Sequence, residues 1–186
     1  MCFRCLLTLS PARKVQPLPV EFVIQDRDEA ARCAANLDAN VINCFTDGSR
    51  ILGRSGSGLV AYRDSEEWFS DSVPLGEWAT VFQAEVHALT SLANSLAGRG
   101  LHGSSINIFT DSQAVLLALE GGRVAANTIV DCRDSIQKLV DENNTVKILW
   151  VPGHTGVPGN ERADELARAG SVSVHLGVEP CLPVSK

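Results

Sequence analysis

The fold of this chain depends on one stretch, Asn43-Cys44-Phe45-Thr46-Asp47-Gly48-Ser49. From Val41 onward its side chains alternate between two sides, and its β-branched and aromatic types are typical of a pleated strand. Gly48 and Ser49 then break the strand, so we expect it to end at Asp47. A half-buried carboxylate at that point is costly unless it is paired or holds a cation. Asp47 is therefore the first candidate for a functional residue.

A second segment, Ile106-Asn107-Ile108-Phe109-Thr110-Asp111, repeats this pattern. Nothing else around the two segments matches, so we interpret them as neighbouring strands rather than as a duplicated domain. Side by side and parallel, they would bring Asp47 and Asp111 close together. Asp111 also precedes a predicted helix at residues 114–120, and capping that helix is the alternative explanation for it.

The clearest predicted helix covers residues 80–97. A stripe of residues recurs along it at helical spacing and consists of Val81, Glu85, Leu89, Leu92 and Leu96. Glu85 in this stripe is either a satisfied core acid or a ligand that points into a site, and its position leaves both open. His87 lies off the stripe and is expected to face solvent.

The other predicted elements indicate a mixed sheet. Residues 50–57 are expected to form a loop, followed by an antiparallel hairpin with strands at 58–63 and 67–73. A further helix is predicted at 127–141 and a further strand at 145–151. Because strands alternate with helices in the second half while the first half supplies a hairpin, we expect an α/β fold with a mixed sheet.

Length and composition favour a single globular domain, since the chain has 186 residues and is 45% hydrophobic. We expect this domain at residues 41–172. It follows an N-terminal flank at 1–40, with one short helix at 26–37, and precedes a C-terminal tail at 173–186. No run approaches the roughly 18 apolar residues that a membrane-spanning helix needs.

Charge and cysteine usage bound the partners and the compartment. The net charge of −6 does not itself predict a nucleic-acid partner, because proteins that bind phosphates usually carry surplus Lys and Arg. Carboxylates that hold divalent cations would change the local charge. The six scattered cysteines, without a secretory signal, indicate an intracellular, reducing compartment such as the cytoplasm or nucleus.

Two features near the N-terminus have alternative interpretations. Cys2 and Cys5 have zinc-ligand spacing, but no second pair lies nearby, so we prefer free thiols. The first 20 residues contain Arg4, Arg13 and Lys14 but no acid. A transit peptide for an organelle is therefore open beside an ordinary flexible tail.

A Gly- and Pro-rich loop connects the last predicted strand to a helix that runs to residue 169. His154 stands on this loop, and Asp164 lies one turn into the helix. With Asp47, Glu85 and Asp111, Asp164 makes four acids to place around one point.

Four neighbouring carboxylates would repel one another strongly unless divalent cations lay among them. Hard cations such as Mg²⁺ prefer carboxylate oxygens and water. Two such ions roughly 4 Å apart clamp the attacking and leaving oxygens of a phosphodiester displacement. The residues therefore predict hydrolysis or transfer at phosphate.

Four motifs, taken together in chain order, resemble the type 1 ribonuclease H family. They are Phe45-Thr46-Asp47-Gly48-Ser49, Gln83-Ala84-Glu85, Phe109-Thr110-Asp111-Ser112-Gln113, and Gly153-His154-Thr155-Gly156 through Asn160-Glu161-Arg162-Ala163-Asp164-Glu165-Leu166-Ala167. The resemblance covers about residues 41–172. It implies a five-stranded mixed sheet with helices on both faces. It also implies endonucleolytic cleavage of the RNA strand of an RNA–DNA hybrid, with 5′-phosphate and 3′-hydroxyl products.

The resemblance further implies a role for each acid. Asp47 would bridge two Mg²⁺ ions, with Mn²⁺ as an alternative metal, and Asp164 would complete the site of the ion that activates water. Glu85 and Asp111 would hold the ion at the leaving oxygen. His154 would assist proton transfer or product release.

Substrate contacts are implied for Gly48, Ser49, Thr80, Gln113 and Asn160. Thr80 matches a position that grips a phosphate of the DNA strand, and Asn160 matches a polar position near the scissile phosphate. Glu85 and backbone groups near Gly48 and Ser49 could contact the 2′-hydroxyl that distinguishes RNA from DNA.

The chain also departs from many cellular members. A cationic, Trp-rich handle is missing, and only Arg123 is basic in residues 121–127. The segments Phe82-Gln83-Ala84-Glu85 and Pro152-Gly153-His154-Thr155-Gly156 resemble retroelement versions. We therefore expect a domain derived from a retrotransposon polyprotein, in which a reverse transcriptase supplies much of the grip on substrate.

Two alternatives remain open at this point. One is a different nuclease or an integrase on the same fold. The other is a catalytically idle domain that only binds nucleic acid or a partner, although the presence of all four acids argues against it.

Overall fold

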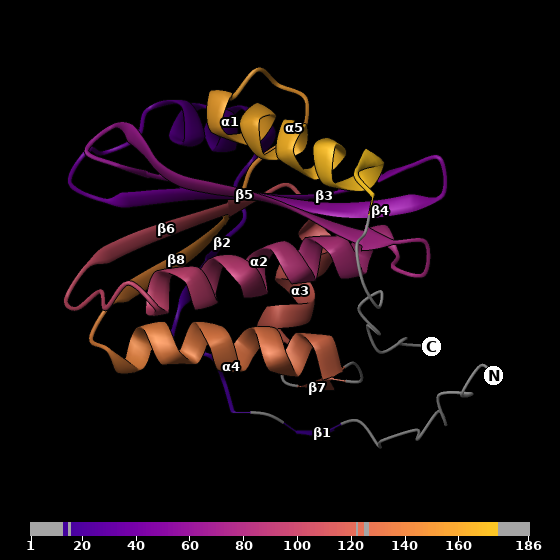
Figure 1. The fold of residues 1–186 in the computed structure, drawn as a ribbon. Coiled ribbons are helices and arrows are strands. Elements are labelled where there is room, and N and C mark those ends of the chain that lie inside the picture. The colour runs from indigo at the N-terminus through magenta and orange to yellow at the C-terminus, as the bar shows by residue number, and fades with distance from the viewer. Residues whose placement is uncertain (1–12, 15, 122, 125–126, 175–186) are drawn as a thin grey trace.

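A six-stranded sheet lies between two layers of helices in the computed structural model, which describes residues 13–14, 16–121, 123–124 and 127–174 (Figure 1). The sheet has the order β2-β8-β6-β3-β4-β5, with β2 at Glu21–Val23, β3 at Ile42–Ile51, β4 at Arg54–Arg63, β5 at Glu66–Gly76, β6 at Ser105–Thr110 and β8 at Thr145–Trp150. One face carries α1 (Arg27–Ala35) and α5 (Pro158–Val172), and the other carries α2 (Val81–Ala97), α3 (Gln113–Glu120) and α4 (Asn127–Asp141). A two-stranded ribbon pairs β1 (Arg13–Lys14) with β7 (Arg123–Val124).

The sheet is mixed, which confirms the predicted fold class. β3 runs parallel to β6 and antiparallel to β4, β5 extends the antiparallel half, and β8 and β2 extend the parallel half. The predicted number of five strands is one too few, because β2 pairs with β8 through Phe22 and Ile148. Lys147 on β8 adds an ion pair of 2.8 Å to Glu21. A strand of three residues is too short to show an alternating pattern. The sequence therefore did not predict that β2, in the N-terminal flank, joins the sheet.

The alternation along β3 divides the core into two halves, as predicted. Cys44 packs into the cluster beneath α2, α3 and α4, whereas Phe45 packs into the cluster on the side of α1 and α5. Phe45 stacks on Phe109 of β6 with ring centroids 4.7 Å apart. A stacked pair of this kind contributes about 0.5–1.5 kcal/mol beyond its buried area.

The predicted end of β3 at Asp47 and the loop at residues 50–57 are both wrong. β3 continues to Ile51 and turns through Leu52 and Gly53, whose φ angles of 50° and 83° suit a two-residue hairpin turn. The small residues that follow are required by packing. A Cβ at Gly56 or Gly58 would lie 2.2–2.5 Å from backbone atoms of α5.

His87 does not face solvent as expected. It is half-buried, and its Nδ1 lies 2.9 Å from Oγ of Ser57 on β4. Burial lowers the pKa of this imidazole. The off-stripe side of α2 is covered here because His87 packs against Ser57 of β4.

The structure also bears on the predictions for the N-terminal flank and for the cysteines. The helix predicted at 26–37 is α1, and Asp26 caps it by accepting hydrogen bonds from Asp28 N and Glu29 N. Among the described residues, Cys33, Cys44 and Cys132 are free thiols, while Cys2 and Cys5 lie outside that range. Most of the segment considered as a transit peptide also lies outside it. Within the described part of the chain, no helix has the length and apolarity to cross a membrane.

Candidate active site

Three of the predicted acids meet where β6 ends. Thr110, the last residue of β6, pairs with Thr46, so Asp47 is the first residue of β3 that extends past its parallel neighbour. Asp111 follows Thr110 directly. Oxygen atoms of Asp47, Asp111 and Glu85 all lie within 4.8 Å of one another. The predicted proximity of Asp47 and Asp111 is therefore confirmed, although Asp47 lies inside a strand rather than at its end.

Glu85 reaches this point because α2 approaches β3 closely. Thr80 caps the helix in a reciprocal box, in which its hydroxyl accepts from Gln83 N and the Gln83 side chain accepts from Thr80 N. Gly48 permits the approach, since a Cβ there would lie 2.5 Å from Glu85 N. Glu85 is only 6% exposed, and its Oε2 has no hydrogen-bond partner among the described residues. This geometry favours the ligand interpretation of Glu85 over a satisfied core acid.

Burial and mutual repulsion make the charged forms of these acids costly. Burial, with repulsion from Asp111 and Asp164, raises the pKa of Asp47 to about 7. Burial, with repulsion from Asp47 and Asp111, raises the pKa of Glu85 to about 10. Burial also raises the pKa of Asp111, and the nearby His154 opposes that shift. The charged forms of these acids are therefore destabilised in the folded protein, and a bound cation would offset that cost.

Asp164 joins the same group from α5, on the opposite side of the sheet from α2. Its carboxylate repels those of Asp47 and Asp111 and so helps to raise the pKa of both. Arg168 Nε lies 2.8 Å from Asp164 Oδ1 and partly balances this charge. Asp164 therefore acts electrostatically on two acids of the group, while its close neighbours are His154 and Glu161, and its role as a metal ligand stays a prediction.

Asn160 and Asp111 show how the α5 loop meets the strand ends. The Asn160 side chain donates a hydrogen bond to the Asp111 carboxylate, and Asn160 is 3% exposed. Its Oδ1 is a buried acceptor that has no partner among the residues described. The alternative role of Asp111 as a helix cap is wrong, because the cap position of α3 is Ser112 and it has no side-chain capping bond.

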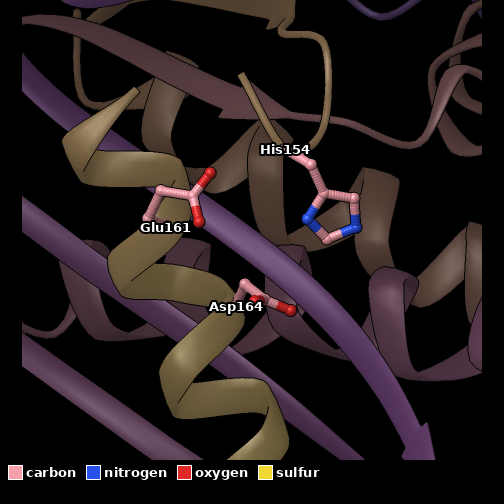
Figure 2. A group of neighbouring side chains, drawn as sticks. All are labelled: His154, Glu161 and Asp164. Atoms are coloured by element: carbon pink, nitrogen blue, oxygen red, sulfur yellow. The ribbon is translucent and has the colours of Figure 1, made fainter. Parts of the chain in front are cut away.

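His154 forms a second group with Asp164 and with Glu161, which the sequence had not singled out. The three side chains offer ligand atoms within 4.8 Å of one another. Figure 2 shows the His154 imidazole on the loop beside the two carboxylates on α5. Glu161 and Asp164 are three residues apart on one helix, so their shared side was visible in the spacing. The spacing did not predict a role for Glu161.

The predicted substrate-binding residues lie around these acids. Gly48 and Ser49 continue β3 beyond Asp47, and Thr80 is exposed at the start of α2. Gln113 is exposed at the start of α3, two residues after Asp111. Their contacts with a substrate stay a prediction.

Comparison with known proteins identifies the family. The sequence model of the RNase H family matches residues 39–172. A ribonuclease H of Yersinia pestis is 31% identical over 155 residues, which cover 73% of this chain and 92% of that relative. The chain belongs to the ribonuclease H family. It is accordingly an enzyme of the ribonuclease H class.

Solved structures of ribonucleases H share the fold. RNase H1 from Halobacterium salinarum NRC-1 superposes with a TM-score of 0.57 at 26% identity, covering 69% of this chain and 96% of that chain. LC11-RNase H1, solved in complex with an RNA/DNA hybrid, has a TM-score of 0.58 at 22% identity and covers 70% and 96%. At this identity the second likeness supports the fold alone.

Proposed function

We propose that the chain hydrolyses the RNA strand of RNA–DNA hybrids endonucleolytically, using two divalent cations and leaving 5′-phosphate and 3′-hydroxyl ends. The observation that carries this proposal is the convergence of Asp47, Glu85 and Asp111 within 4.8 Å. Membership of the ribonuclease H family supports the substrate class.

The residues at the site fit divalent cations. Their donors are hard carboxylate oxygens, which suit Mg²⁺ and Mn²⁺. Glu85 Oε2 is buried without a partner among the described residues, and the crowding that raises the pKa of Asp47 would be relieved by positive charge. Asp47, Glu85, Asp111 and Asp164 would hold the ions. When bound, two such ions would stabilise the attacking and leaving oxygens of a phosphodiester displacement.

Each acid has a distinct place in this proposal. Asp47 interacts with both Asp111 and Asp164, which makes it the candidate for a ligand shared between two ions. Asp164 serves the side where water attacks, and Glu85 with Asp111 serves the side of the leaving oxygen. Asn160 Oδ1, which has no partner among the described residues, could accept a hydrogen bond from a water at the site.

His154 is the proton carrier of the proposal. It is exposed on its loop and lies within 4.8 Å of Asp164, at the edge of the acid group. Histidine exchanges protons near neutral pH. The imidazole would deliver a proton to the departing 3′-oxygen or assist release of the 5′-phosphate product.

Substrate recognition would use the residues that border the acids. Thr80 would bind a DNA-strand phosphate. Gly48, Ser49 and Gln113 would contact the RNA strand, where a 2′-hydroxyl distinguishes RNA from DNA. The retroelement-like motifs support descent from a retrotransposon polyprotein, with a reverse transcriptase as the partner that strengthens binding.

Replacing Asp47 tests the proposal. Asp47→Asn should abolish cleavage of a labelled RNA–DNA hybrid in Mg²⁺ while the protein stays folded, because it removes a metal ligand rather than packing. The assay compares hybrid, duplex RNA and duplex DNA, each with and without a chelator. Equal cleavage of duplex DNA would favour the rival nuclease or integrase activity, and binding without cleavage by the parent would favour an idle domain. Full activity of Asp47→Asn would show that the site is assigned wrongly.

A further inference from the structure

Glu161 has no part in the proposed reaction, although it belongs to the second side-chain group. It lies in the first turn of α5, three residues before Asp164, and is half-buried. Its carboxylate lies within 4.8 Å of both the His154 imidazole and the Asp164 carboxylate. Figure 2 shows Glu161 and Asp164 on neighbouring turns of α5, on the helix side that faces the loop.

The loop that carries His154 has an unusual backbone. His154 has a φ of 56° and Gly156 a φ of 74°, so a non-glycine residue occupies the left-handed region. Such a conformation persists only where the surrounding structure fixes it. Gly153 is also confined, because a Cβ there would lie 2.6 Å from Asp111 Oδ2. The position of the imidazole therefore depends on what holds this loop.

Among the described residues, two side-chain hydrogen bonds hold the loop, beside the helical bond of 3.0 Å from Glu161 N to the Val157 carbonyl, and they differ in reach. Thr155 Oγ1 donates to the Pro152 carbonyl at 2.8 Å, which closes the loop on itself. The Gly156 N–H donates to Glu161 Oε1 at 3.3 Å, which connects the loop to α5. This second bond ties the segment that carries His154 to the helix that carries Asp164.

We propose that Glu161 is a positioning residue that holds the loop at residues 152–157 against α5 and so keeps the His154 imidazole beside Asp164. The inference rests on the proposed function, because the imidazole needs its position only if it moves a proton there. The competing explanation is that Glu161 stabilises α5 through its charge at the helix N-terminus.

Two substitutions at Glu161 separate these explanations. Gln keeps an oxygen that can accept from Gly156 N–H but loses the charge, whereas Ala loses both. We expect Glu161→Ala to lower kcat on hybrid about tenfold with little change in KM, a part of the roughly 100-fold or larger contribution of a proton-transfer group. Glu161→Gln should stay within about twofold of the parent. A helix-charge role predicts equal effects of Gln and Ala.

The matched control is Glu165→Ala on the same helix. Glu165 pairs with Arg162 on the surface and does not belong to the group around His154. Its removal also takes a negative charge from α5. It should leave kcat and KM unchanged.

A double-mutant cycle with His154→Ala tests whether Glu161 acts through the imidazole. In the His154→Ala background, Glu161→Ala should cause no further loss of kcat, since no imidazole is left to position. An equal loss in both backgrounds would overturn the inference, because it would show a role independent of His154.

A readout that needs no activity keeps the inference separate from the proposed function. The backbone ¹H–¹⁵N heteronuclear NOE at residues 153–157 should fall in Glu161→Ala and be kept in Glu161→Gln. If the parent does not cleave hybrid, the proposed function fails while the NOE still tests the tether. If the parent is active and Glu161→Ala changes neither kcat nor the NOE, the positioning role is wrong.

Discussion

Single residues at this site differ mainly in what opposes their charge. Asp164 has Arg168 beside it and Asp111 has Asn160, whereas the second oxygen of Glu85 has no partner among the described residues. Asp47 lies between repelling neighbours. The least compensated acids are thus the two most buried ones, which is where a cation would gain most from binding.

Gly153 leads to a prediction about the same residues. The nearest atom to an added Cβ is Asp111 Oδ2 at 2.6 Å, and that atom is the end of a side chain that can rotate away. Gly153→Ala should therefore displace the carboxylate while costing about 1 kcal/mol or less of folding free energy. We expect kcat on hybrid to fall on the order of 100-fold, as for other small misplacements of catalytic groups.

Steady-state kinetics and thermal unfolding together check this expectation. Gly98→Ala is the matched control, since its Cβ would meet only ordinary contacts beginning at 3.4 Å. Unchanged kcat in Gly153→Ala would mean that the Asp111 carboxylate has no fixed place in the reaction.

Among the elements, the sequence predicted best where the apolar period is long. α2 and α4 match their predicted ranges within a residue or two, because many residues along each helix must repeat the same spacing. β3 was cut short at Asp47, because the Gly and Ser residues around its hairpin are strand residues only in the presence of α5. β2 was not predicted, because its 3 residues are too few to show a period.

The residues of the site also differ in whether a sequence motif or a tertiary contact determines their place. The clustering of Asp47, Glu85 and Asp111 could be predicted because each lies in a motif of fixed spacing, whereas the roles of the acids and of His154 stay predictions. Glu161 could not, since its bond to Gly156 depends on the backbone of a loop. His87 was misplaced because the side of α2 off the stripe packs against β4.

The close contact between β4 and α5 depends on glycine in β4. A Cβ at Gly58 would lie 2.3 Å from both Ala163 O and Ala167 N, which are backbone atoms that cannot rotate away. Gly58→Ala should therefore push α5 off the sheet and cost about 1–3 kcal/mol or more. Urea unfolding should show a lower midpoint than Gly98→Ala, and hybrid cleavage should fall because α5 carries Asp164. A wild-type midpoint would refute the close packing of α5 on β4.

Across the whole molecule, the N-terminal flank is part of the fold. β2 covers the edge of β8, and α1 packs beside the Phe45 cluster. Arg133, 4% exposed, donates to the Leu119 carbonyl and, at 2.5 Å, to the Gln16 carbonyl, so it connects the flank to α3 and α4. The region that matches the family begins at residue 39, so the flank residues that make these contacts precede it. The stability of the catalytic domain in this chain therefore includes its flank.

Global stability should also report the charge of the site through its pH dependence. In the folded, metal-free protein the pKa of Asp47 is raised to about 7 and that of Glu85 to about 10, from ordinary values near 4. At pH values between the ordinary and the raised pKa of each acid, the folded state binds more protons than the unfolded state. The free energy of unfolding therefore falls as pH rises through this range. The contribution of Asp47 is complete below pH 4 and is lost as pH rises through about 7. His87, whose pKa is lowered, acts in the opposite direction at acidic pH.

Denaturant unfolding in a chelator should therefore give a lower free energy at about pH 8 than at about pH 5, by a few kcal/mol. Asp47→Asn removes the Asp47 contribution and leaves His87 in place, so its curve should be flatter, and it should be more stable than the parent at the higher pH. Excess Mg²⁺ should restore stability to the parent there, because the cation binds the ionised carboxylates of the folded state alone. Asp47→Asn should respond to Mg²⁺ much less. A parent whose stability at about pH 8 is unaffected by both Mg²⁺ and Asp47→Asn would contradict a repulsive, cation-binding cluster.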